Sequence, residues 1–318
     1  MKTLWNHTGR APRFSFRLPP GGGLPHFIIL FSLLLLTAPA GLVSSCNGPH
    51  EDITYPGEGV TVPIDSSTFT LRFQVQDNIS DSARRAERLD VFLYEAEGIR
   101  QLDTWRRLDG IPDSLCIRTS ARPKTVVAIA NCPRAFNRSA IERFDSMELL
   151  SLEFDEDSPS APLLSGTCSA DPGKEVLVTL CPLMCRVVLS RISNTMTGYV
   201  RLEDPRIWLE NMNLDAEVLR ESGFRPSEFI QGTRKVSLPY DIGIFTQTPF
   251  TELFCYPNDS AELTIGTPAT TFVLECEISG STCRFPVKLP PLKRNSTVYV
   301  EMTVHGKGDA EANAYQTR

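Results

Sequence analysis

The feature that most constrains the fold of this chain is the alternation of apolar and polar residues in short segments. The clearest example covers residues 69–76, where Phe69, Leu71, Phe73 and Val75 are separated by polar residues. Because successive side chains of a β-strand point to opposite faces, this alternation predicts a strand with one buried face. The chain is therefore expected to build its core from β-sheets.

Similar segments recur along the chain and are separated by Gly, Pro, Asn and Asp, which favour turns. The other segments expected to form strands are 88–94, 99–105, 115–117, 125–130, 163–164, 175–180, 183–192, 206–210, 235–238, 252–256, 271–278, 284–289 and 297–304. About seven strands in each half predict an all-β fold of two tandem Greek-key β-sandwiches. We expect the N-terminal β-sandwich domain at residues 67–182 and the C-terminal one at residues 183–318.

Three segments depart from this alternation. Residues 125–130 are apolar on both faces, which predicts a central strand covered on both sides. Residues 141–150 predict the one convincing helix, because Ser139 and Glu142 have the spacing of a capping box. Residues 214–221 predict a single helical turn. Helix is thus expected to be a minor component of the fold.

Residues 1–45 have the pattern of a bacterial lipoprotein signal peptide. A basic start is followed by the apolar run 27–36, and the segment ends in Val43–Ser44–Ser45–Cys46. Small residues before a cysteine form a lipobox, so we expect cleavage before Cys46 and attachment of a diacylglycerol to its thiol. The alternative is an ordinary secretory signal with a cysteine at this place by chance. Residues 46–66 are expected to form a lipidated tether, and no other segment is apolar enough to predict a membrane span.

Eight cysteines follow Cys46, and an even number in an exported protein allows disulfides. Cys181 and Cys185 cannot pair with each other if they share a strand, because about 13 Å would then separate their Cα atoms. Cys276 and Cys283 flank an expected hairpin turn and are predicted to lie opposite each other. They form either a cross-strand disulfide or two buried thiols, and the sequence leaves both interpretations open.

The composition argues against several kinds of chemistry. After the leader only two histidines remain, His50 and His305, and the chain has no paired C-x-x-C knuckles, G-x-S-x-G elbow or Walker loop. We therefore expect no catalytic residue, no metal site and no cofactor. The formal net charge of −6 offers no basic face, so no nucleic-acid partner is expected. The acidic cluster 153–157 is expected to be a solvated loop, and single aromatic residues such as Trp208 and Tyr240 are expected in the core.

Several short strings occur in an order and spacing that resemble those of one family. They are Ala130–Asn131–Cys132–Pro133, Pro162–Leu163–Leu164–Ser165–Gly166, Pro182–Leu183–Met184–Cys185–Arg186–Val187, Asp204–Pro205–Arg206–Ile207, Cys255–Tyr256–Pro257–Asn258 and Leu274–Glu275–Cys276–Glu277–Ile278. Behind a lipobox, this set resembles the fimbrillin-associated anchor lipoproteins, the minor fimbrial anchoring subunits of type V pili. The resemblance covers residues 46–305.

The resemblance implies two transthyretin-like β-sandwiches and no enzyme activity. It also implies that the lipid on Cys46 holds the protein in the cell outer membrane, where it anchors a fimbrium at the cell surface and limits its length. The implied partner is the fimbrial shaft subunit, bound by strand complementation or by surface docking. The tail 306–318 departs from this pattern, because three alanines and Tyr315 are poor apolar residues for a donor strand.

Two other functions remain as alternatives. The chain could be a fimbrial tip or accessory subunit whose first strand is removed by proteolysis, or a surface glycan-binding lipoprotein. Residues 47–71 contain no Lys or Arg, and the first basic residue after Cys46 is Arg72, inside the expected first strand. The pair Arg84–Arg85 lies only after that strand. A trypsin-like protease therefore finds no flexible site between the lipid and the first strand, which favours the anchor.

Overall fold

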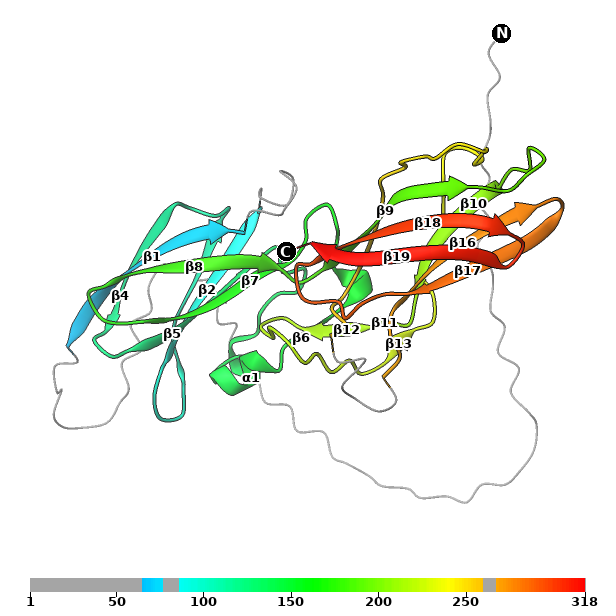
Figure 1. Ribbon diagram of the computed structural model, residues 1–318. Coiled ribbons are helices and arrows are strands. Elements are labelled where there is room, and N and C mark those ends of the chain that lie inside the picture. Colours follow the sequence, from blue (N-terminus) through cyan, green and yellow to red (C-terminus); the bar gives the residue numbers. More distant parts are fainter. Residues whose placement is uncertain (1–64, 77–85, 260–266, 318) are drawn as a thin grey trace, which may run out of the picture. The chain divides into compact units, whose positions relative to one another are not determined.

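The structure is a computed structural model that describes residues 65–76, 86–259 and 267–317. Across these residues it contains nineteen β-strands, one five-residue α-helix and two 3-10 turns (Figure 1). The prediction of an all-β fold is confirmed. Among the described residues, no helix is long and apolar enough to span a bilayer. The predicted signal peptide and lipidated Cys46 lie outside the described residues.

The first half of the described chain forms a seven-stranded sheet with the order β3-β2-β5-β7-β8-β1-β4. Its strands are β1 (Ser66–Val75), β2 (Arg88–Glu95), β3 (Leu102–Asp109), β4 (Ser114–Ser120), β5 (Lys124–Ala130), β7 (Leu164–Ala170) and β8 (Glu175–Pro182). β1 pairs with β4 in an antiparallel ladder and with β8 in a parallel one. The apolar faces of both parts of the sheet share one core, to which Phe69, Val91 and Val126 belong. We call this unit the first sandwich.

Contacts between its two edge strands close the first sandwich. The Thr119 hydroxyl on β4 donates to Asp103 Oδ2 on β3 at 2.6 Å. At the same end Lys124 is fully buried, and its Nζ lies 2.6 Å from Asp103 Oδ2 and 2.8 Å from Glu95 Oε1. The two carboxylates supply the opposite charge that a buried ammonium group needs.

The corner between β7 and β8 depends on one glycine. A Cβ atom at Gly166 would lie 2.1 Å from the Thr179 carbonyl oxygen, a distance that no real Cβ contact reaches. The absence of a side chain at Gly166 therefore allows the backbone of β8 to cross close to β7.

Strands β2 and β5 are buried on both faces, and for β5 this confirms the prediction from residues 125–130. One face belongs to the core just described, and the other belongs to a second cluster that includes Phe92 and Val127. Residues between β5 and β7, among them Met147, cover this outer face together with Val218 and Phe224 from the second half of the chain. The central strands are thus shielded by a layer to which both halves contribute.

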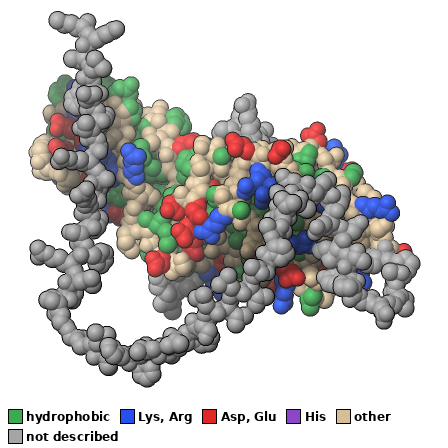
Figure 2. Space-filling view, turned by 180° about the vertical axis from the view of Figure 1, so that it is seen from behind, with side chains coloured by type: hydrophobic (Ala, Val, Ile, Leu, Met, Phe, Trp, Pro, Cys, Tyr) green, Lys and Arg blue, Asp and Glu red, His purple; other side chains and the backbone are tan. Residues whose placement is uncertain are grey.

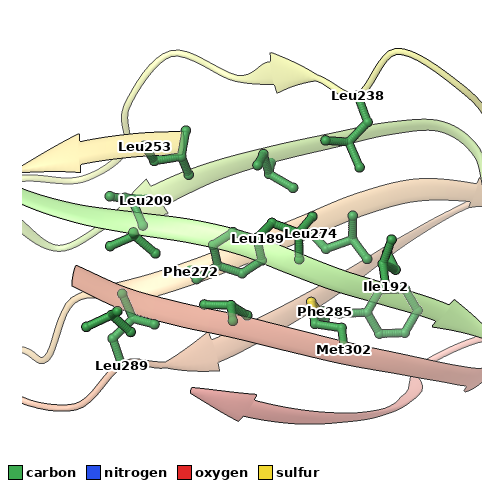
Figure 3. Packing of buried hydrophobic residues seen from close by; sticks show 14 of the residues in the cluster. Leu189, Ile192, Leu209, Leu238, Leu253, Phe272, Leu274, Phe285, Leu289 and Met302 are labelled. Carbon is green, nitrogen blue, oxygen red and sulfur yellow. The ribbon is translucent and has the colours of Figure 1, made fainter. Parts of the chain in front are cut away.

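The second half forms a sandwich of two four-stranded sheets, with the orders β14-β10-β16-β17 and β15-β9-β18-β19 (Figure 1). Its strands are β9 (Cys185–Asn194), β10 (Glu203–Glu210), β14 (Val236–Ser237), β15 (Thr251–Cys255), β16 (Thr271–Ile278), β17 (Ser281–Lys288), β18 (Thr297–Gly306) and β19 (Asp309–Thr317). Leu189 and Met302 from one sheet meet Phe272 and Phe285 from the other in a dense apolar core (Figure 3). We call this unit the second sandwich.

Four short strands form two small ladders outside these sheets. β6 (Ser151–Glu153) pairs with β12 (Asp215–Glu217), and β11 (Met212–Asn213) pairs with β13 (Phe229–Ile230). The prediction of a helical turn at 214–221 is therefore wrong. Its backbone instead pairs with β6 and places Ala216 in the apolar cluster over β2 and β5.

The predicted helix at 141–150 is wrong in extent. Only α1 (Phe144–Glu148) is α-helical, and Arg138–Ala140 forms the 3-10 turn η1, while Phe154–Glu156 forms η2. The Ser139 N–H donates to the Asn137 side chain at 3.1 Å, so Ser139 is not the cap of a longer helix. Asn137, two residues earlier in the sequence, supplies the side-chain acceptor instead.

Candidate functional site

Two strands stand out because of where the chain enters and leaves its sheets: β1, the first described strand, and β19, the last. β1 contributes Phe69 and Leu71 to the core of the first sandwich, and neither side chain is exposed. Its backbone pairs on both sides, with Leu71 opposite Leu115 in β4 and opposite Val176 in β8. β1 is therefore an internal strand, and its loss would open an apolar groove between β4 and β8.

Arg72, the first basic residue after Cys46, lies within this strand. Its side chain is 59% exposed and its Nη1 is 3.5 Å from Glu175 Oε1, but its backbone lies between Ser114 and Leu177 in the two ladders. The prediction that Arg72 lies inside the first strand is confirmed, and its side chain points outward. A protease needs an extended, accessible backbone, so the ladders protect the peptide bond after Arg72. The Arg84–Arg85 pair lies outside the described residues.

β19 is the edge of its sheet, since β18 is its one ladder partner among the described strands. Ala310 and Ala314 pack against the core of the second sandwich, and Tyr315 stacks on Tyr299 with 5.9 Å between ring centroids. The Tyr315 hydroxyl also donates to Glu301 Oε1 at 3.3 Å. β19 thus has a weak apolar face and an unpaired backbone edge, which is the feature that strand addition uses.

Three aromatic side chains are strongly exposed on loops of the second sandwich: Tyr199 at 85%, Tyr240 at 72% and Phe245 at 75%. We call them the aromatic rim. The loops that carry them are joined, because Leu202 and Ile242 exchange two backbone hydrogen bonds of 2.9 Å. The expectation of a core position for Tyr240 is wrong.

The rim could not be recognised from the sequence, because single aromatic residues such as Tyr240 are expected in the core more often than on the surface. Trp208, by contrast, is packed as expected. It is 5% exposed, with Lys235 Nζ 4.3 Å from its ring centroid.

The surface charges are mixed. Acidic and basic side chains are interspersed on the face shown in Figure 2. Ion pairs connect neighbouring strands elsewhere in the described chain as well, such as Arg191 with Glu301 at 2.6 Å and Arg186 with Glu252 at 3.0 Å. Exposed pairs of this kind each contribute little to stability. In the part of the chain that the structure describes, no group of three or more His, Cys, Asp or Glu side chains is arranged to hold a metal.

The acidic cluster 153–157 is only in part a solvated loop. Asp157 is 8% exposed, and its Oδ1 accepts hydrogen bonds of 2.9 Å from the backbone of Ser158 and Leu163. Burial raises the pKa of Asp157 to about 6 despite these bonds. Glu156 is ion-paired with Arg134. Asp157 therefore has a structural role, as the anchor for the turn that leads into β7.

Cys276 and Cys283 lie directly opposite each other in the hairpin of β16 and β17, and both are buried. Their thiols are not bonded to each other in this structure. Burial, with a contribution from the neighbouring Cys283, raises the pKa of Cys276 to about 12. The register supports a cross-strand disulfide, which stays a prediction. No site residue other than these two and Cys46 was expected.

Solved structures of known proteins share this fold. No family model matches the chain, and no curated protein matches it by sequence. A solved structure of a protein assigned to cell adhesion, from Parabacteroides distasonis ATCC 8503, matches with a TM-score of 0.62 and 11% identity, over 80% of this chain and 98% of that chain.

Two further matches come from Porphyromonas gingivalis. The tip fimbrial protein Mfa3, with a C-terminal truncation, matches with a TM-score of 0.57 and 11% identity, over 79% of this chain and 99% of that one. A fimbrilin from strain W83 matches with a TM-score of 0.56 and 8% identity, over 80% of this chain and 97% of that one. The chain therefore has the fold of fimbrial and cell adhesion proteins.

Proposed function

We propose that this chain is a non-catalytic outer-membrane lipoprotein that anchors a fimbrium, a type V pilus, to the cell surface and limits its length. The shared fold supports a fimbrial role. The observation that favours the anchor is the position of β1, which is paired on both sides and carries Arg72 within its ladders. A lipid on Cys46 would stay covalently joined to the folded body, because no Lys or Arg precedes Arg72 in residues 47–71.

The proposed partner is the fimbrial shaft subunit. Surface docking or strand addition at the β19 edge would leave β1 in place, whereas strand complementation in the groove of the first sandwich would require β1 to leave. We also propose that the two domains cover residues 67–182 and 183–318, and that the protein uses no cofactor and binds no nucleic acid. A subunit that keeps β1 offers no groove to a further subunit, and this would limit the length of the fimbrium.

The anchor is tested by replacing the lipidated residue. The variant Cys46→Ala should be released from the outer-membrane fraction, and fimbriae should be shed into the medium. A conservative variant in the tether, such as Asn47→Gln, is the matched control and should stay in the membrane with fimbriae attached. A Cys46→Ala protein that remains in the membrane fraction would contradict the lipid anchor.

Limited proteolysis separates the anchor from a tip or accessory subunit. An Arg-specific protease under native conditions should leave β1 in place, because the backbone at Arg72 is held in two ladders. Amino-terminal sequencing of the product reads the result. Efficient cleavage after Arg72 or Arg85, with a folded remainder that joins the fimbrium, would assign the chain to the tip or accessory class.

The aromatic rim favours a surface glycan-binding lipoprotein as a second candidate function. Exposed tyrosine and phenylalanine rings can stack on the apolar faces of sugars, and exposed apolar patches often mark binding sites. A glycan array and calorimetry would test this function with the variants Tyr240→Ala and Phe245→Ala. Ile99→Ala, at an exposed apolar residue of the first sandwich, is the control. Binding that the rim variants do not weaken, or no binding to any glycan, would reject the rim as a sugar site.

A further inference from the structure

Cys185 and Cys255 form a second pair of facing thiols, far apart in the sequence. They lie directly opposite each other in the antiparallel ladder of β9 and β15. Cys185 is 1% exposed and Cys255 is not exposed, and both belong to the core of the second sandwich. Their side chains therefore point to the same face of the same sheet.

This placement meets the geometric requirements of a disulfide. Directly opposed residues of an antiparallel pair have Cα atoms about 4.5 to 5.5 Å apart, and a disulfide needs about 4.4 to 6.8 Å. The two thiols also interact: hydrogen bonding with Cys185, together with burial, raises the pKa of Cys255 well above its ordinary value. β18 pairs with β9 on its other edge from Arg186 onward, so β9 is held on both edges immediately after Cys185.

The remaining cysteines lack such a partner in the sheets. Cys116 lies opposite Thr70, Cys168 opposite Val126 and Cys181 opposite Ser165, while Cys132 lies beyond the end of β5. Among the eight described cysteines, facing pairs therefore occur only in the second sandwich, and Cys185 with Cys255 is the pair that connects distant segments.

We propose that Cys185 and Cys255 form a cross-strand disulfide in the exported protein. The reaction is thiol–disulfide exchange with oxidised glutathione or with a disulfide-bearing oxidase. A sulfur–sulfur bond forms between the two cysteines, the oxidant's disulfide is broken, and two electrons and two protons pass to its thiols. This inference rests on the proposed function in one respect, because it requires that the chain is exported.

The bond would lie close to a set of hydrogen bonds between the second sandwich and the first. The Cys185 thiol now donates to the Lys293 carbonyl at 3.0 Å, and the next residue, Arg294, is almost completely buried. Arg294 donates to the carbonyl oxygens of Cys181 at 2.8 Å and Ser165 at 3.1 Å in the first sandwich. A disulfide there closes a loop of about 70 residues and fixes β15 beside this connection.

Peptide mapping of the refolded chain tests the bond. The full chain with Cys46→Ala is refolded with reduced and oxidised glutathione, free thiols are alkylated in denaturant, and the protein is digested without reduction. Trypsin with a Glu-specific protease separates Cys255 from Cys276 and Cys283, and fragmentation distinguishes Cys181 from Cys185. We expect a peptide that joins Cys185 to Cys255, with a mass about 2 Da below that of the two reduced peptides.

Three variants make the result specific. Cys185→Ala and Cys255→Ala should each lose the joined peptide and leave the other cysteine free, whereas Cys276→Ala should retain it. The part of the reductant-dependent shift in melting temperature that comes from the Cys185–Cys255 bond should be lost in the first two variants and kept in the third. If a variant fails to fold, the map of the parent chain decides alone. A folded parent chain in which Cys185 and Cys255 are both alkylated would overturn the proposal.

The same map from cells separates this inference from the anchor. Cells are treated with an alkylating reagent before lysis, and the native protein is recovered from the outer-membrane fraction. A joined Cys185–Cys255 peptide is expected, and free thiols there would overturn the bond in the exported protein. The anchor is judged by the Cys46→Ala fractionation, whose outcome does not depend on this bond.

Discussion

The two sandwiches place their opening strands in the same way. In the first, β1 lies between antiparallel β4 and parallel β8, and in the second, β9 lies between antiparallel β15 and parallel β18. They differ in the neighbour on the far side of the parallel strand. β8 pairs there with β7, whereas β18 turns directly into the edge strand β19. The first sandwich thus begins with a strand that is paired on both sides, and the second ends with an edge strand that is paired on one side.

Burial also distinguishes the sandwiches. Both faces of β2 and β5 are covered in the first sandwich. In β18 of the second sandwich, the four residues Val298, Val300, Met302 and Val304 alternate with partly exposed ones. A polar substitution in β2 or β5 of the first sandwich therefore lies far from water on both faces. The effects of such substitutions should exceed those of substitutions in β18.

The largest effect is expected from a charge in the doubly covered strand. Val127→Asp should abolish folding of the first sandwich, because an unpaired buried carboxylate costs several kcal/mol or more. Leu177→Asp, on β8 of the same sheet and 51% exposed, is the control and should melt nearly as the parent does. Circular dichroism and thermal melting measure both. A soluble Val127→Asp protein with unchanged melting would show that β5 is not a central strand.

The next largest loss of stability is expected from cavities in the two opening strands, β1 and β9. Leu71→Ala in β1 and Leu189→Ala in β9 each remove a fully buried side chain and should each lower the free energy of unfolding by about 2–5 kcal/mol. Hydrogen exchange should then localise the damage, with faster exchange in β4 and β8 for the first variant and in β15 and β18 for the second. Equal loss of protection in both sandwiches for either variant would mean that they unfold as one unit.

A smaller, pH-dependent effect is expected at Asp157, which lies in the cover of the first sandwich. Its pKa is raised from 3.8 to about 6, so the folded state holds the proton more tightly than the unfolded chain does. This contribution to stability is fully present below about pH 4 and is lost as the pH rises through about 6, by at most about 3 kcal/mol.

Asp157→Asn should remove this dependence and stabilise the protein at pH 7. The amide oxygen can still accept the hydrogen bonds from Ser158 and Leu163. Denaturant unfolding at pH 4.5 and pH 7 measures the difference between variant and parent. A variant that keeps the parent's pH dependence would assign that dependence to another group.

The smallest effect is expected at the edge of the second sandwich. Tyr315→Ala removes a stacked but partly exposed ring and should cost about 1 kcal/mol or less. Tyr315→Phe, which keeps the ring and loses only the hydrogen bond to Glu301, should be nearly neutral. Thermal melting measures the stability of each variant, and hydrogen exchange of the β19 amides measures how often this strand detaches from the sheet edge. A loss as large as that of Leu189→Ala would show that β19 is an integral strand of the sandwich.

Local sequence patterns were sufficient to predict three kinds of feature. Alternation predicted most strands, the apolar run 126–130 predicted burial on both faces, and the short hairpin predicted that Cys276 faces Cys283. Contacts between distant segments decided the rest. β19 was missed because its inward residues are small. The predicted helix at 141–150 begins only at Phe144, because Arg143 is extended and forms a β-bridge with Gln101. The facing of Cys185 with Cys255 and the burial of Asp157 depend on which segments become neighbours, which only the tertiary fold determines.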